Sequence, residues 1–173
     1  MIEPVRIRLA RPADVEAIHT MLSQLAVAVG HDEAMVATPH DLFHYGFGPR
    51  PAFEALIAES GGRAVGLCLW FETFSTWRGR PGVYVQDLFV DEAARGLGLG
   101  RMLLAAAAQR GRAVGANHLR LSVDHANNDA KAAYRSMGLA HVEEDHIFQI
   151  GGAPFDALAG GGPVIEMAGG EAH

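Results

Sequence analysis

The chain has 173 residues, is 49% hydrophobic, and carries a formal net charge of −6 from 14 basic and 20 acidic residues. This length suits one domain with a real core and is too short for two domains of ordinary size. The acidic balance argues against a nucleic-acid surface, and no apolar run approaches the roughly 18 residues of a membrane span. We therefore expect a cytoplasmic protein with one domain, residues 1–159, and a glycine-rich tail, residues 160–173, that contacts neither nucleic acid nor membrane.

The first half of the chain predicts a strand, two helices and a β-hairpin. Alternation of apolar and polar residues indicates the strand, and Pro12 marks the first turn of the first helix. Thr38 and Pro39 stand in the order expected for the start of the second helix. The expected elements cover residues 5–10 (strand), 11–29 and 38–48 (helices), and 52–60 and 63–75 (hairpin strands joined at Gly61 and Gly62).

The second half of the chain continues the alternation of strands and helices. Its expected elements are strands over 82–90, 118–123 and 141–150, helices over 100–114 and 128–137, and one helical turn over 154–159. Strands and helices in this order predict an α/β (α+β) fold, a mixed sheet with helices on both faces. The single cysteine, Cys68, excludes an internal disulfide, and its apolar neighbours predict a buried strand thiol.

Three glycines, Gly96, Gly98 and Gly100, lie between the 82–90 strand and the following helix. At such a point free backbone amides and the positive end of the helix dipole converge, which favours a phosphate. Glycine also permits positive φ and close approach of the backbone. The spacing differs from G-x-G-x-x-G, and no Lys-Ser or Lys-Thr of a P-loop follows. The run therefore predicts either a phosphate site of another kind or only a tight strand-to-helix turn.

Two motifs resemble those of the GNAT-type N-acetyltransferases. "RGLGLG" (95–100) matches the family's Arg/Gln-x-x-Gly-x-Gly/Ala signature, and "NNDAKAAYRSMGL" (127–139) is similar to its second block, with Leu139 where the family usually has Phe. Residues 38–48 and 74–90 resemble the diamine branch, which includes spermidine/spermine and thialysine-like acetyltransferases. The resemblance spans about residues 5 to 159 and implies a mostly antiparallel sheet whose splayed strand pair holds acetyl-CoA.

The same resemblance implies how acetyl-CoA is held. The backbone of the 82–90 strand would pair with the pantetheine arm, the glycine-turn amides would hold the pyrophosphate, and Tyr134 would lie beside the sulfur. The implied cofactor-binding residues are Leu88, Phe89, Val90, Arg95, Gly96, Leu97, Gly98, Leu99, Gly100, Arg101, Asn127, Ala130 and Tyr134.

Tyr134 also has a chemical reason to be catalytic. When an amine attacks a thioester, the departing thiolate needs a proton, and a phenol with a pKa of about 10 can donate one near a thiol of about 8.5. The alternative is that the ring of Tyr134 only packs against the sheet. We predict the catalytic role, that of general acid.

The acceptor side departs from the diamine branch. Gln86 stands where the branch usually has a Glu, and an amide accepts no proton at neutral pH. Ala28 and Val29 replace an aromatic and an acidic residue of the relatives. A long polyamine is therefore a less favoured acceptor, and a small amine, an amino acid or a peptide N-terminus is a more favoured one. We expect Gln86, His125 and His146 to contact the substrate, while Asp32, Glu33, Asp87 and Asp124 are further candidates for the missing charge.

The histidines bear on whether the protein binds a metal, and the aromatic residues bear on whether it forms a dimer. His40 and His44 have an i, i+4 spacing near His31, yet no H-E-x-x-H motif is present and amine acetylation needs no metal, so we expect none. The diamine branch implies a homodimer, and the aromatic segment 71–77 is a candidate contact. The alternative is that these rings fill the protein's own core.

Three functions remain open at this point. The first is an acetyl-CoA-dependent N-acetyltransferase that acts by direct attack on a small primary amine, such as an amino acid, a thialysine-like amine or a diamine. The second, motivated by Gln86, is an acyl-CoA-binding regulatory module without turnover. The third is a protein lysine or N-terminal acetyltransferase, which would need an open groove.

Overall fold

The computed structural model describes residues 4–162, which contain one five-stranded sheet and five α-helices. The chain divides after Gly138 into two compact units. The first unit holds the sheet and four helices, and the second holds the last helix. The strands are β1 (Arg6–Leu9), β2 (Glu54–Ser60), β3 (Arg63–Ser75), β4 (Arg80–Val90) and β5 (Leu119–Leu121). The helices are α1 (Val15–Ala28), α2 (Pro39–Phe47), α3 (Leu99–Ala113), α4 (Asn128–Ser136) and α5 (Gly152–Gly160).

The strands lie in the order β1-β2-β3-β4-β5. The first four pair antiparallel, and β2 and β3 are joined at Gly61 and Gly62, whose φ angles of 57° and 72° suit a tight hairpin turn. β5 pairs parallel to β4, because α3 carries the chain back across the sheet between them. The predicted hairpin and the mixed, mostly antiparallel sheet are confirmed.

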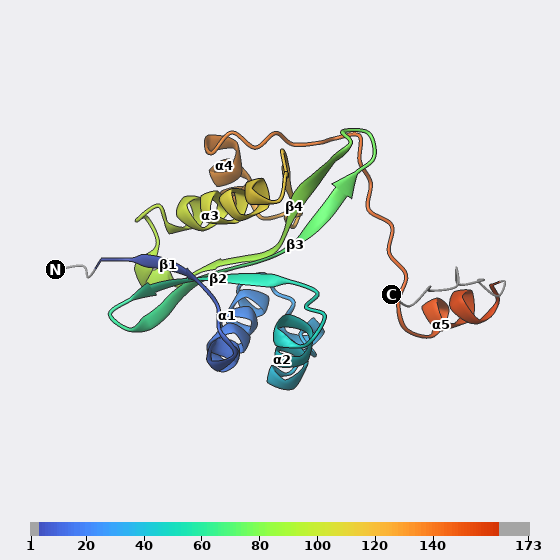
Figure 1. The fold of residues 1–173 in the computed structure, drawn as a ribbon, viewed down its shortest axis with the longest axis horizontal. Coiled ribbons are helices and arrows are strands. Elements are labelled where there is room, and N and C mark those ends of the chain that lie inside the picture. The colour runs from blue at the N-terminus through green and yellow to red at the C-terminus, as the bar shows by residue number, and fades with distance from the viewer. Residues whose placement is uncertain (1–3, 163–173) are drawn as a thin grey trace, which may run out of the picture. The chain divides into compact units, whose positions relative to one another are not determined.

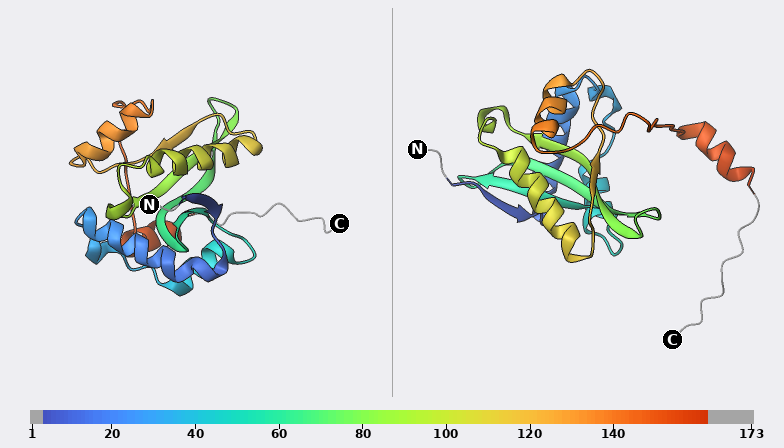
Figure 2. Two further views of the ribbon diagram at one scale, coloured as in Figure 1. Left: turned by 90° about the vertical axis from the view of Figure 1, so that its left-hand side faces the viewer. Right: turned by 90° about the horizontal axis from the view of Figure 1, so that it is seen from above.

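Helices cover both faces of the sheet, as the sequence predicts. Figures 1 and 2 show α3 and α4 on one face and α1 and α2 on the other. The core on the α3 side contains Cys68, Trp70 and Leu103, and α4 adds Tyr134 to its edge. The core on the α1 side is built around Ile18 and neighbouring strand residues. The site described below lies where these two layers meet the ends of β4 and β5.

Two elements near the C-terminus differ from the prediction. Residues 141–150 form no strand, and all ten are exposed. The stretch contains three consecutive acidic residues, Glu143, Glu144 and Asp145, which favour solvent and interrupt the alternation that a half-buried strand needs. The helical turn expected over 154–159 is part of the nine-residue helix α5.

Candidate active site

The pairing of β4 with β5 ends well before β4 does. Val85 opposite Leu121 is the last pair of this ladder, whereas β4 continues to Val90. From Gln86 onward, β4 pairs only with β3, where Leu88 faces Cys68. Along this stretch, residues 4–162 supply no strand on the β5 side. An open edge of this kind offers backbone groups to an extended ligand, which is the geometry expected of Leu88, Phe89 and Val90.

A β-bulge lies at the point where the two strands part. Leu69 pairs with Asp87 and Trp70 with Val85, so Gln86 is an extra residue in β4. Beyond the bulge, the odd-numbered residues of β4 therefore point to the opposite face of the sheet. Val85 packs in the α3-side core, whereas Phe89 packs in the α1-side core. Gln86 itself is exposed and Asp87 is half-buried beside it.

The glycine turn has the conformation and the space that a phosphate cradle requires. Gly96 and Gly98 have φ angles of 79° and 74°, and Gly98 is the N-cap of α3. The first amides of a helix have no partner within it. A Cβ placed on Gly96 or Gly98 would meet nothing within 4 Å, and one on Gly100 would meet only Leu88 Cδ2, at 3.9 Å. The turn therefore faces open space next to the free end of β4.

The side chains around this turn have different surroundings. Leu99 is 2% exposed and belongs to the core, so only its backbone can face a ligand. Leu97 and Arg101 are exposed. The guanidinium of Arg95 donates to the carbonyl of Val90 at 3.3 Å and so connects the turn to the end of β4. The predicted residues 88–90 and 95–101 are thus brought together.

α4 carries Tyr134 to the same region. Asn127 caps the helix, because its side-chain oxygen accepts from the amide of Ala130 at 3.1 Å. Tyr134 is half-buried, and burial, with a smaller effect from the Cys68 thiol, raises the pKa of its hydroxyl. Burial likewise raises the pKa of Cys68 to about 12, which confirms the predicted buried thiol. Both groups are protonated at neutral pH, as a proton donor must be.

The other face of β4 presents polar groups, of which the sequence alone singles out Asp87. The hydroxyls of Tyr84 and Ser122 lie 2.8 Å apart, and Phe71 stacks on Tyr84 with ring centroids 5.1 Å apart. Burial raises the pKa of Asp87. Alternation along β4 is the only signal that could have singled out Tyr84, because its partner Ser122 is 38 residues away.

The predicted substrate histidines are not gathered into one cluster. His125 is almost fully exposed, with Nδ1 3.7 Å from an Asp124 carboxylate oxygen. His146 lies in the second unit, in the exposed segment that follows Gly138. His31, in the loop after α1, instead approaches Asp124, with Nε2 3.5 Å from Oδ2. Asp124 therefore has two histidine neighbours that are distant from each other in sequence.

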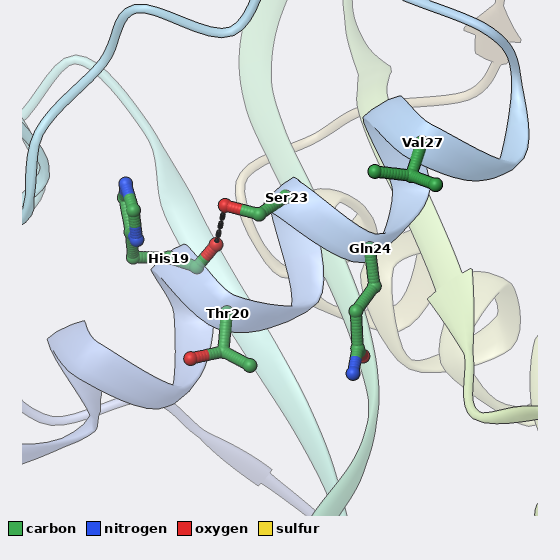
Figure 3. Close-up of a pocket in the computed structure, with 5 residues that line it drawn as sticks. All are labelled: His19, Thr20, Ser23, Gln24 and Val27. Atoms are coloured by element: carbon green, nitrogen blue, oxygen red, sulfur yellow. Dashed lines mark hydrogen bonds between the residues drawn. The ribbon is translucent and has the colours of Figure 1, made fainter. Parts of the chain in front are cut away.

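A separate hollow of about 410 Å³ lies on the flank of α1 and is lined by residues of that helix alone. Figure 3 shows its residues, with the Ser23 hydroxyl donating to the His19 carbonyl at 2.9 Å. None of them belongs to the predicted site. Within residues 4–162, no three histidine, cysteine or acidic side chains are grouped to hold a metal ion. None of the helices in this range is long and apolar enough to cross a membrane.

An open strand edge, a glycine turn at a helix start and a half-buried tyrosine thus lie around the free end of β4. The profile of the acetyltransferase (GNAT) family matches residues 16–139. The chain therefore belongs to the GNAT family of acetyltransferases.

Individual relatives place the chain in the diamine branch of the family. It is 30% identical over 167 residues to the thialysine N-epsilon-acetyltransferase of Bos taurus, with 90% of this chain and 98% of that protein covered. It is 31% identical over 154 residues to the human spermidine/spermine N(1)-acetyltransferase-like protein 1, with 83% of this chain and 22% of that protein covered. Among solved structures, the aminoglycoside N-acetyltransferase AAC(6')-Iy in complex with CoA shares the fold, with a TM-score of 0.67 at 19% identity and coverage of 85% and 95%.

Proposed function

We propose that the protein transfers an acetyl group from acetyl-CoA to the primary amine of a small molecule. The observation that supports this proposal is that the free end of β4 lies beside the open glycine turn. Leu88 belongs to this strand end and also lies next to Gly100 of the turn. The implied acetyl-CoA fits these residues: backbone groups of 88–90 would hold its arm, and amides of 96–101 its pyrophosphate. Acetyl-CoA supplies the thioester carbon that the amine attacks. The small-amine class follows the named substrate of the thialysine relatives.

Tyr134 is the proposed proton donor. As the amine nitrogen bonds to the carbonyl carbon and the carbon–sulfur bond breaks, the leaving sulfur takes a proton. The raised pKa keeps the Tyr134 hydroxyl protonated until that moment. A positioned general acid of this kind contributes on the order of 10²-fold or more to the rate.

Asp87 is the proposed acceptor of the amine's proton, directly or through water. Gln86 cannot take it, because an amide is not basic at neutral pH. Asp87 follows Gln86 at the bulge, is half-buried, and has a raised pKa, which makes its carboxylate a better base than an exposed one.

The test is a thiol-release assay with acetyl-CoA and a panel of small amines, amino acids and a lysine peptide, alongside calorimetric titration of acetyl-CoA. We expect binding and release of CoA with at least one small amine. Binding without release for any acceptor would favour the regulatory module, and release only with the peptide would favour a protein acetyltransferase.

We also propose that the protein is a cytoplasmic homodimer with a catalytic domain over 1–159. The dimer rests on the hairpin tip between β3 and β4, where Phe74 is 64% and Trp77 is 99% exposed. Of the three predicted aromatic residues, Phe71 stacks within the chain on Tyr84. Exposed rings of this size favour a protein contact. Sedimentation that gives only an 18.4 kDa species at micromolar concentration would contradict the dimer.

A further inference from the structure

The loop between β5 and α4 begins at the open end of the β4–β5 pair. Leu121 makes the last ladder contact with β4, and Ser122 is held to Tyr84 on the neighbouring strand. Asp124 follows two residues later, within about 7 Å of chain from that contact. If the proposed function is right and the thioester lies where β4 and β5 part, an acceptor amine would approach near the start of this loop, which contains Asp124.

The Asp124 carboxylate is fixed on one side and loosely held on the other. One oxygen accepts from the amide of Ala126 at 2.8 Å, while the other faces His31 at 3.5 Å. The latter distance exceeds the roughly 2.7–2.9 Å of a tight charge-assisted hydrogen bond. The side chain is 36% exposed, so an incoming cation can reach it.

Histidine side chains from the loop after α1 and from the β5–α4 loop approach Asp124. His31 comes from the loop after α1, and His125 from the same loop as Asp124 itself. Lys131 of α4 donates to the carbonyl of His125. Asp124 is the negatively charged residue among these four, and a cationic substrate would displace His31 from it.

We propose that Asp124 is a specificity residue for the acceptor, binding a second positive charge remote from the reacting nitrogen. His31 occupies this carboxylate in the free protein, and the substrate's remote ammonium replaces it. The anionic contact of the acceptor site thus lies on the β5–α4 loop, whereas position 86 of β4 holds a neutral glutamine. The inference rests on the proposed acetyltransferase function and adds a determinant of acceptor choice to it.

The experiment compares putrescine with butylamine, two amines of equal length that differ by one ammonium group. In steady-state thiol release, we expect Asp124→Asn to raise the KM for putrescine by about threefold to fivefold, the range of an exposed ion pair. The KM for butylamine and both kcat values should stay unchanged. Asp129→Asn, which removes an equal charge from the exposed first turn of α4, is the matched control.

His31→Gln gives the second arm of the experiment. Removal of a competing imidazole should lower the KM for putrescine. An equal change for both amines in Asp124→Asn, or no change, would overturn the inference while leaving the acetyltransferase function in place. If the wild-type protein releases no thiol with these two amines or with any acceptor of the wider panel, both the inference and the proposed acetyltransferase function are overturned.

Discussion

The coenzyme side and the acceptor side of the proposed site are built in different ways. The proposed coenzyme side consists mainly of one continuous stretch, the end of β4 and the glycine turn, and its proposed ligand groups are backbone amides and carbonyls. The proposed acceptor side combines side chains from distant segments, such as His31, Tyr84 and Asp124. Recognition by backbone depends on local conformation, whereas recognition by side chains depends on which segments the fold brings together.

This difference explains why one side matches a family signature and the other does not. Positive φ at Gly96 and Gly98 is a local requirement that only glycine meets easily. An anionic contact for an amine can come from any nearby element, so a glutamine at position 86 is compatible with a carboxylate supplied elsewhere. Variants on the two sides should therefore separate coenzyme binding from acceptor choice.

The largest effect is expected at Tyr134, where the two sides meet. Tyr134→Phe removes the proton donor but little volume, so turnover should fall about 10²-fold or more while the acetyl-CoA Kd changes little. Steady-state kinetics and calorimetry on the same preparation measure both quantities. Unchanged turnover would remove the tyrosine from the mechanism.

Gly100→Val tests the coenzyme side. The new side chain would project into the space beside Leu88, where a Cβ alone finds only one atom within 4 Å. Gly100 does not have a positive φ, so the substitution should leave the fold intact. We expect acetyl-CoA affinity to fall by about tenfold or more, since the loss of well-placed amide contacts to a charged group costs roughly 1.5–3 kcal/mol.

Ala105→Val, on the exposed face of the same helix, is the control for Gly100→Val, because it adds a β-branched residue away from the turn. Calorimetric titration gives the affinities, and circular dichroism checks the fold of each variant. If Gly100→Val binds acetyl-CoA as tightly as the wild type, the phosphate cradle lies elsewhere.

Gln86→Glu tests the acceptor side by adding the carboxylate that the diamine branch usually carries. Because residue 86 is exposed, the gain should be about 1 kcal/mol or less, or at most about a fivefold lower KM for a diamine. A neutral-tailed amine should show no such gain. Equal behaviour of the two amines would mean that residue 86 does not face the acceptor.

Asp87→Asn should show that the carboxylate of Asp87, in the proposed acceptor site, lowers the stability of the folded protein at neutral pH. Burial raises the pKa of Asp87 in the folded state, so its contribution to stability is fully present at low pH and is lost as pH rises through the folded pKa. At neutral pH the variant should be more stable by about 1 kcal/mol, the scale of a poorly solvated polar group. Urea unfolding at neutral pH and near pH 3 measures the difference, which should vanish at the lower pH.

Turnover is the second quantity to measure for Asp87→Asn. If Asp87 takes the amine's proton, turnover should fall as stability rises. Greater stability with unchanged turnover would assign the proton to water or to another group.

The sequence by itself determined the elements whose signals are local: the hairpin at Gly61 and Gly62, the start of α2 at Thr38, and the glycine turn before α3. These follow from φ preferences, capping groups and alternation over a few residues. The motif that contains Tyr134 was also visible, since its residues lie within a few turns of one helix.

Only the tertiary structure decided the contacts between distant segments. The bulge at Gln86 follows from the register of β4 against β3, and the approach of His31 to Asp124 joins the loop after α1 to the loop before α4. The stretch 141–150 has enough apolar residues to suggest a strand, yet a strand exists only where a partner ladder forms, and none does within the described chain. Local preference is a property of neighbouring residues, whereas register and long-range pairing depend on packing of the whole fold, which spacing along the chain does not contain.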